Sequence, residues 1–151
     1  MSAGRIRPVS TGDAAAWLRL RRALWPENTV EEHDREIERF FGGEAREPQA
    51  VLLAEDEELR IVGMAELSIR SYAEGCRTSR VAYLEGWFVE AHARRRGIGR
   101  ALLAAAEAWG RSQGCAEFAS DADADNDVSA AAHRSLGFEE AGLVRCFRKD
   151  L

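Results

Sequence analysis

The segment that decides the fold is WFVEAHARRRGIGRALL, residues 87–103. An apolar strand leads into a short loop with the pattern Arg-x-x-Gly-x-Gly, and an amphipathic helix follows. The first N–H groups of such a helix have no partner within it, and the helix dipole makes that end positive. This order therefore predicts a pyrophosphate site, in which Gly97 and Gly99 let the main chain approach the ligand. The alternative is a basic, solvated turn before an ordinary helix, because the glycine spacing alone is a weak motif.

Length and composition predict a single domain over residues 1–151, with one sizeable core. No apolar run approaches the roughly 18 residues of a membrane span, and the N-terminus lacks the apolar stretch of a signal peptide. We therefore expect a cytoplasmic protein. The three cysteines are widely spaced and odd in number, which argues against a disulfide framework and a zinc site and leaves a catalytic thiol as a minor alternative.

The net charge of −5 hides two clusters of opposite sign. Basic residues gather between Arg94 and Arg100, whereas acidic residues recur from Asp121 to Asp127. A positive pocket suits an anionic cofactor, and an acidic one suits a cationic substrate. A nucleic-acid partner fits poorly, because the chain is acidic and carries one short basic cluster rather than a stripe.

Apolar periodicity, capping residues and turn signals predict the remaining elements. The expected strands cover residues 5–9, 51–55, 61–69, 81–89 and 117–120, with one or two more within 139–149. The expected helices cover residues 12–24, a stretch capped by Thr29 and ending near Phe41, the stretch that follows Gly97 and ends near Gly114, and 128–136. The fold class is α/β (α+β), a mixed central sheet with helices on both faces.

Three ordered motifs carry a family resemblance. They are the strand Glu85–Val89, the loop Arg94–Gly99, and Asn126 placed seven residues before His133, with Gly137-Phe138 closing. Over residues 61–149 the chain resembles the GNAT superfamily of acyl-CoA N-acetyltransferases. It resembles the bacterial aminoglycoside 6'-N-acetyltransferases still more closely, through segments that extend over nearly the whole chain: 24–26, 68–70, 84–86, 118–121 and 133–138.

The resemblance implies a GNAT fold, acetyl-CoA as the co-substrate and no metal. It implies that backbone groups of Phe88 and Val89 hold the acetyl and pantetheine portion, and that Asn126 contacts the pantetheine or thiol region. The implied pyrophosphate loop comprises Arg94, Arg95, Arg96, Gly97, Ile98, Gly99 and Arg100. The positions that line the aminoglycoside site are Trp25, Tyr72, Glu85 and Asp121. A late acidic position of the family corresponds to Gly142 here, so one substrate contact of the family is missing.

Three ionisable residues are the candidate catalytic groups. Glu85 interrupts an apolar strand, where a carboxylate either binds the substrate's ammonium groups and accepts a proton through water, or neutralises a neighbouring arginine such as Arg70. Glu66 is a second candidate for the same role. Asp121 follows a strand at its C-terminal end, where open sheets tend to bind ligands, although it could also belong to a solvated loop. The resemblance places His133 where many relatives carry a tyrosine general acid, and the alternative is a structural histidine.

The leading hypothesis is an aminoglycoside 6'-N-acetyltransferase that works by direct transfer in a ternary complex and confers antibiotic resistance. A second hypothesis keeps the superfamily and makes the acceptor a polyamine, an amino sugar or a peptide amine. A third is a non-catalytic acyl-CoA-binding module. We expect a homodimer, from the resemblance and from two apolar features, Trp87 and the segment Leu143–Phe147.

Overall fold

A five-stranded sheet forms the centre of the molecule, and the computed structural model describes residues 4–45 and 47–151. The strand order is β1-β2-β3-β4-β5; every neighbouring pair is antiparallel except β4 and β5, which are parallel. The strands are β1 (Arg5–Pro8), β2 (Ala50–Glu55), β3 (Ile61–Arg70), β4 (Val81–Val89) and β5 (Phe118–Ser120). The mixed sheet and its strand positions agree with the sequence-based expectation.

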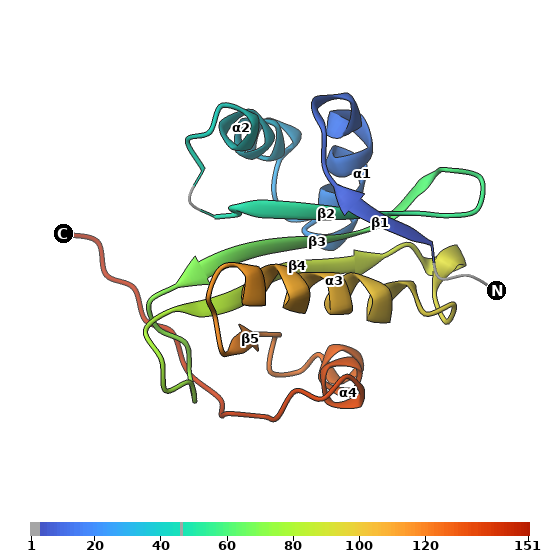
Figure 1. Cartoon of the computed structure of the whole chain (residues 1–151). Coiled ribbons are helices and arrows are strands. Elements are labelled where there is room, and N and C mark those ends of the chain that lie inside the picture. Colours follow the sequence, from blue (N-terminus) through green and yellow to red (C-terminus); the bar gives the residue numbers. More distant parts are fainter. Residues whose placement is uncertain (1–3, 46) are drawn as a thin grey trace.

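Helices cover both faces of this sheet. Figure 1 shows α1 (Ala14–Leu24) and α2 (Val30–Phe41) on one side, and α3 (Ile98–Ser112) on the other, with α4 (Asp127–Ser135) near β5. Short 3-10 turns at Thr11–Asp13 and Ala91–Ala93 precede α1 and α3. Thr29 caps α2 as predicted: its hydroxyl accepts from Glu32 N at 3.1 Å, and Glu32 Oε2 accepts from Thr29 N at 2.9 Å.

Two layers of buried side chains hold the sheet between the helices. Leu53 and Met64 pack against Trp17 and Leu20 of α1, whereas Leu52 and Val62 belong to the cluster that α3 completes with Leu102 and Ala106. Successive strand residues point to opposite faces, so β2 and β3 are buried on both sides. This explains why their sequences are nearly continuous apolar runs rather than alternating ones.

A β-bulge places the one carboxylate of β4. Glu66 of β3 pairs with Gly86, but the next residue, Leu67, pairs with Leu84, which leaves Glu85 without a partner in the register. A bulge adds a residue to one strand and redirects the side chains around it. Here Glu85 turns toward Arg70, while the α-carbon of Gly86 faces Trp25.

Strand β5 pairs with only the first half of β4. The three residues of β5 pair with Ala82, Tyr83 and Leu84. From Glu85 to Val89 this edge of β4 has no strand partner within the described residues. Backbone groups along this edge thus have no strand partner as it runs toward the start of α3, and one of its carbonyls, Val89 O, accepts from Arg94 Nε instead.

The predicted terminal strands are absent. Within the described residues, no helix or strand follows Ser135, and the chain runs away from the body toward its C-terminal end (Figure 1). Leu143, Val144 and Phe147 are exposed. The apolar content of residues 139–149 favours a strand, but a strand also needs a partner edge, and this segment pairs with none in its own chain.

Candidate active site

The loop before α3 presents a helix N-terminus as predicted. Gly97 is the N-cap with φ of 80°, a left-handed conformation that suits glycine, and the first helical bond runs from Ala101 N to Gly97 O at 2.9 Å. The N–H groups of the preceding helical residues therefore have no carbonyl acceptor within the helix. Ile98 is buried and anchors this turn against the core cluster beneath α3.

The second glycine of the loop, Gly99, also lies close to Trp87 of β4. A Cβ on Gly99 would lie 3.3 Å from Cζ2 of Trp87, so a side chain there would press on the indole. Gly99 thus allows α3 to pack closely against β4.

The arginines of the loop divide into two groups. Arg94 is tied to the end of β4, because its Nε donates to Val89 O at 2.8 Å and its guanidinium lies 5.6 Å from the Phe88 ring. The other three, Arg95, Arg96 and Arg100, are exposed. They place positive charge around the helix N-terminus, where an anion is already favoured.

An acidic cluster lies where the end of β3, the middle of β4 and the end of β5 meet. Arg70 Nε and Nη2 donate to the two oxygens of Glu85 at 2.9 and 2.6 Å, and its guanidinium lies 3.7 Å from the centre of the Tyr83 ring. The Tyr83 hydroxyl in turn donates to Asp121. Burial, followed by the bond to Asp121, raises the pKa of Tyr83, so this hydroxyl keeps its proton and acts as a donor. Both predicted carboxylates are thus joined through Arg70 and Tyr83.

Trp25 forms a wall beside this cluster. A Cβ on Gly86 would lie 2.6 Å from its Cη2, and the Arg21 guanidinium lies 4.8 Å from the centre of its ring. The indole therefore packs between Arg21 of α1 and Gly86 in the β-bulge next to Glu85. Tyr72 is exposed in the loop after β3, and a hydrogen bond with Glu74 raises its pKa.

Residues 17–138 match the acetyltransferase (GNAT) family. The chain belongs to this family. The mixed sheet with flanking helices is the GNAT fold, as the sequence predicted.

Relatives of the chain match it over almost its whole length. The aminoglycoside N(6')-acetyltransferase type 1 of Klebsiella aerogenes is 51% identical over 97% of this chain and 96% of its own. The protein of the same name from Stenotrophomonas maltophilia is 42% identical over 99% and 95%. Among solved structures, AAC(6')-Iy in complex with a bisubstrate analog, CoA-S-monomethyl-acetylneamine, superposes with a TM-score of 0.90 at 36% identity, covering 99% of this chain and 100% of that one.

His133 of this GNAT domain is held by partners at both ring nitrogens. Nδ1 lies 2.7 Å from Ser129 O, so it donates to that carbonyl, and Nε2 lies 2.8 Å from Ser120 Oγ and accepts from it. The ring also packs edge-on against Trp87 and Phe138. His133 therefore joins α4 to the end of β5.

Asn126 is the N-cap of α4. Its Oδ1 accepts from Ser129 N at 3.1 Å, and the residue is exposed. The cap uses the carbonyl oxygen and leaves the side-chain amide N–H groups available for a ligand.

Glu66 is wrong as a candidate substrate ligand. Its carboxylate is buried between Trp17 Nε1, at 2.9 Å, and Arg21 Nη1, at 2.6 and 2.7 Å. Arg21 Nε donates to His33 Nδ1 at 3.2 Å, and the other nitrogen of that buried ring lies 3.1 Å from Trp25 O. The glutamate therefore anchors α1 to the sheet, and the same network continues to the carbonyl of Trp25.

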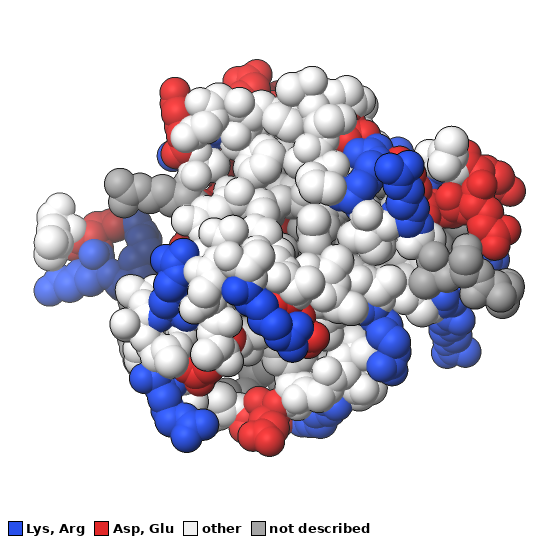
Figure 2. Space-filling model, in the orientation of Figure 1, with Lys and Arg blue, Asp and Glu red and all other residues white. Residues whose placement is uncertain are grey.

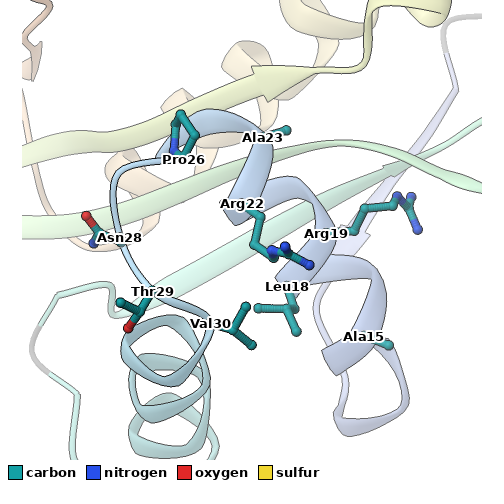
Figure 3. Close-up of a pocket in the computed structure, with 9 residues that line it drawn as sticks. All are labelled: Ala15, Leu18, Arg19, Arg22, Ala23, Pro26, Asn28, Thr29 and Val30. Carbon is teal, nitrogen blue, oxygen red and sulfur yellow. The ribbon is translucent and has the colours of Figure 1, made fainter.

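Two surface grooves are lined by arginines rather than by acids. Figure 3 shows a groove of about 580 Å³ between α1 and the start of α2, where Arg19 and Arg22 are the charged residues and no acid lines it. On the face in Figure 2, basic and acidic side chains are interspersed, and the basic ones form no continuous strip. A second groove, of about 720 Å³, has Arg70 and Arg80 as its charged lining residues and, among the described residues, likewise no acid, although Arg70 itself contacts Glu85 of the acidic cluster.

Sequence reasoning missed two residues of the site. Tyr83 and Ser120 contact Asp121 and His133, respectively, and neither was singled out. A signal existed for both, because Tyr83 lies two residues before Glu85 on the same strand, and Ser120 directly precedes Asp121.

Among residues 4–45 and 47–151, no group of three or more His, Cys, Asp or Glu side chains is arranged to hold a metal ion. Within the same residues, no helix combines the length and apolarity that a membrane crossing requires.

Proposed function

We propose that this GNAT protein transfers the acetyl group of acetyl-CoA to the 6'-amine of an aminoglycoside. The reaction lowers the positive charge of the drug and removes a hydrogen-bond donor, and thereby confers resistance. The observation that carries the proposal is the unpaired edge of β4. Its Val89 end adjoins the positive start of α3, and its Glu85 end adjoins the acidic cluster. The relatives named above support the choice of acceptor.

The residues around α3 would hold the cofactor. Free N–H groups after Gly97, together with Arg95, Arg96 and Arg100, suit the pyrophosphate. Backbone groups of Phe88 and Val89 suit the pantetheine, because a strand edge without a partner can bond an extended amide-containing arm. In this proposal the amide of Asn126 contacts the pantetheine from α4.

The acidic cluster would hold the acceptor. Aminoglycosides carry several ammonium groups, and Glu85 and Asp121 supply the complementary charge. The attacking amine must lose a proton, which a carboxylate of this cluster accepts through water. Trp25 supplies an apolar surface for a sugar ring, and the exposed Tyr72 forms part of the same site in the proposal.

An N–H of the β4 edge would stabilise the developing oxyanion of the thioester. His133 completes the proposed catalytic set as the acid for the leaving thiolate. In its protonated form, Nε2 would donate to Ser120 Oγ, 2.8 Å away, and free the proton of that hydroxyl for the sulfur.

The test is thiol release from acetyl-CoA with a panel of aminoglycosides that carry or lack a 6'-amine. We expect release with kanamycin and none above background with analogues that lack this amine. Coenzyme A binding without release on any member would overturn the antibiotic proposal and favour a binding module. Turnover of spermidine, glucosamine or a peptide that exceeds kanamycin turnover by orders of magnitude would move the acceptor to the polyamine, amino-sugar or peptide class.

We also propose a homodimer in which residues 143–151 of each protomer pack on its partner. Leu143, Val144 and Phe147 are exposed in one chain, and apolar side chains in an extended segment favour pairing with another chain. Trp87, the other predicted interface residue, instead packs inside the protomer against His133 and Gly99. The single domain over residues 1–151 and the cytoplasmic location stay predictions.

Light scattering tests the dimer. We expect twice the protomer mass at micromolar concentration for the full chain and for the control Phe147→Leu. Phe147→Asp should shift the mass to that of a single chain. A wild-type protein that is monomeric under these conditions would contradict the proposal.

A further inference from the structure

Arg70 lies at the centre of the carboxylates that the proposed function assigns to the substrate. As the last residue of β3, it donates to both oxygens of Glu85. Its guanidinium also lies on the Tyr83 ring, whose hydroxyl holds Asp121, and 4.0 Å from Glu47. The single cation Arg70 therefore neutralises part of a cluster of three acids, Glu85, Asp121 and Glu47.

The contact with Glu85 limits what else that carboxylate can bind. Its side chain is only 15% exposed, and each oxygen already accepts from the guanidinium. A substrate ammonium that approached Glu85 would lie close to the Arg70 guanidinium, and two like charges near a protein surface repel each other. The incoming cation must therefore compete with Arg70 for the carboxylate.

Arg70 has room to yield its position. Its side chain is 34% exposed and borders the open groove of about 720 Å³ with Gln49 and Trp109. Arg21, by contrast, is buried against Glu66 and faces no such space. The two arginine–carboxylate pairs thus differ: Arg21–Glu66 is enclosed, whereas the arginine of the Arg70–Glu85 pair lines an open groove.

We propose that Arg70 is a specificity-determining residue, a resident cation that holds Glu85 until an acceptor with several ammonium groups displaces it. The inference rests on the proposed function, because it takes Glu85 as a substrate ligand. It implies that Arg70 weakens acceptor binding and has no part in the chemical step. A positioning role would have the opposite signature, because loss of the arginine would then lower kcat.

The experiment compares wild type, Arg70→Gln and Arg70→Lys. For Arg70→Gln we expect the KM for kanamycin to fall about fivefold to tenfold, with kcat changed less than twofold and a steeper dependence of log KM on log salt, since one more carboxylate is free. Arg70→Lys keeps the charge and should stay within threefold of the wild-type KM. The control Arg60→Gln removes the same charge at the distant β2–β3 turn, where Arg60 pairs with Asp56, and should leave KM unchanged.

Calorimetric titration of kanamycin, without acetyl-CoA, separates the two proposals. A lower dissociation constant for Arg70→Gln than for wild type supports the inference, whether or not either protein turns over. If neither protein turns over kanamycin, that lack of turnover overturns only the proposed function. Turnover by wild type with an unchanged or higher KM in Arg70→Gln would overturn the role of Arg70 and leave the proposed function standing.

Discussion

Replacing Arg21 with Met is expected to lower the free energy of unfolding by about 3–5 kcal/mol, because it leaves a buried carboxylate without its counter-ion. Glu66 is 1% exposed, and Arg21 6%. Burial raises the pKa of Glu66, and the charge of Arg21 and the Trp17 N–H oppose this shift by favouring the ionised form. Removal of Arg21 leaves the desolvation cost and only the Trp17 bond to offset it.

The same substitution removes contacts that connect Glu66 of the sheet with Trp25 in the proposed acceptor site. Arg21 donates to His33, whose ring contacts Trp25 O, and its guanidinium lies on the Trp25 ring. We therefore expect the KM for the acceptor to rise in any Arg21→Met protein that still folds.

Urea unfolding followed by tryptophan fluorescence and far-UV circular dichroism measures the effect. Arg22→Met is the matched control, since this neighbour on α1 is exposed, and it should cost less than about 0.5 kcal/mol. The double variant Arg21→Met with Glu66→Leu removes both charges and should recover much of the loss. A loss below 1 kcal/mol for Arg21→Met alone would contradict this account of the core.

Asp121→Asn is expected to lower kcat/KM for kanamycin about 100-fold or more, the range for loss of a carboxylate that binds a cation and moves a proton. The asparagine carbonyl can still accept from the Tyr83 hydroxyl, so the link between β4 and the loop after β5 survives. What is lost is the negative charge and the basicity. The free energy of unfolding should change by less than about 1 kcal/mol.

Initial rates with kanamycin and calorimetry with coenzyme A check this prediction together. Asp125→Asn is the control, because Asp125 is an exposed acid in the same loop. It should keep kcat/KM within threefold of wild type, and both variants should bind coenzyme A as wild type does. Equal effects of the two substitutions on kcat/KM would contradict a specific role for Asp121, because both acids would then contribute only to the general negative charge of the loop.

Local patterns were sufficient for most of the fold. The Thr29 capping box, the apolar runs around the turn at residues 56–58, the 3.6-residue periodicity and the glycine before α3 each depend on neighbouring residues, and the structure confirms the elements that they predict. The terminal strands were wrong for a non-local reason. A strand forms only where an edge accepts it, and the apolar composition of residues 143–147 carries no information about that edge.

The candidate site was predictable in its residue types but not in its pairings. The sequence suggested Arg70 as one possible partner of Glu85, and the structure shows that pair. It could not separate Glu85 from Glu66, because both are single carboxylates on apolar strands. A bulge directs one toward the cluster, whereas α1 covers the other. The aromatic donor Tyr83 escaped notice because a tyrosine on a strand is ordinary in a core.

The central claim is that a nucleotide thioester lies along the unpaired edge of β4 with its pyrophosphate on the first turn of α3. Hydrogen–deuterium exchange of the full chain with and without coenzyme A tests this most directly. The account predicts slower exchange over Phe88–Ala101 on addition of coenzyme A, with residues 143–151 unchanged. Exchange over Phe88–Ala101 that coenzyme A leaves unchanged, or protection confined to another part of the chain, would contradict it.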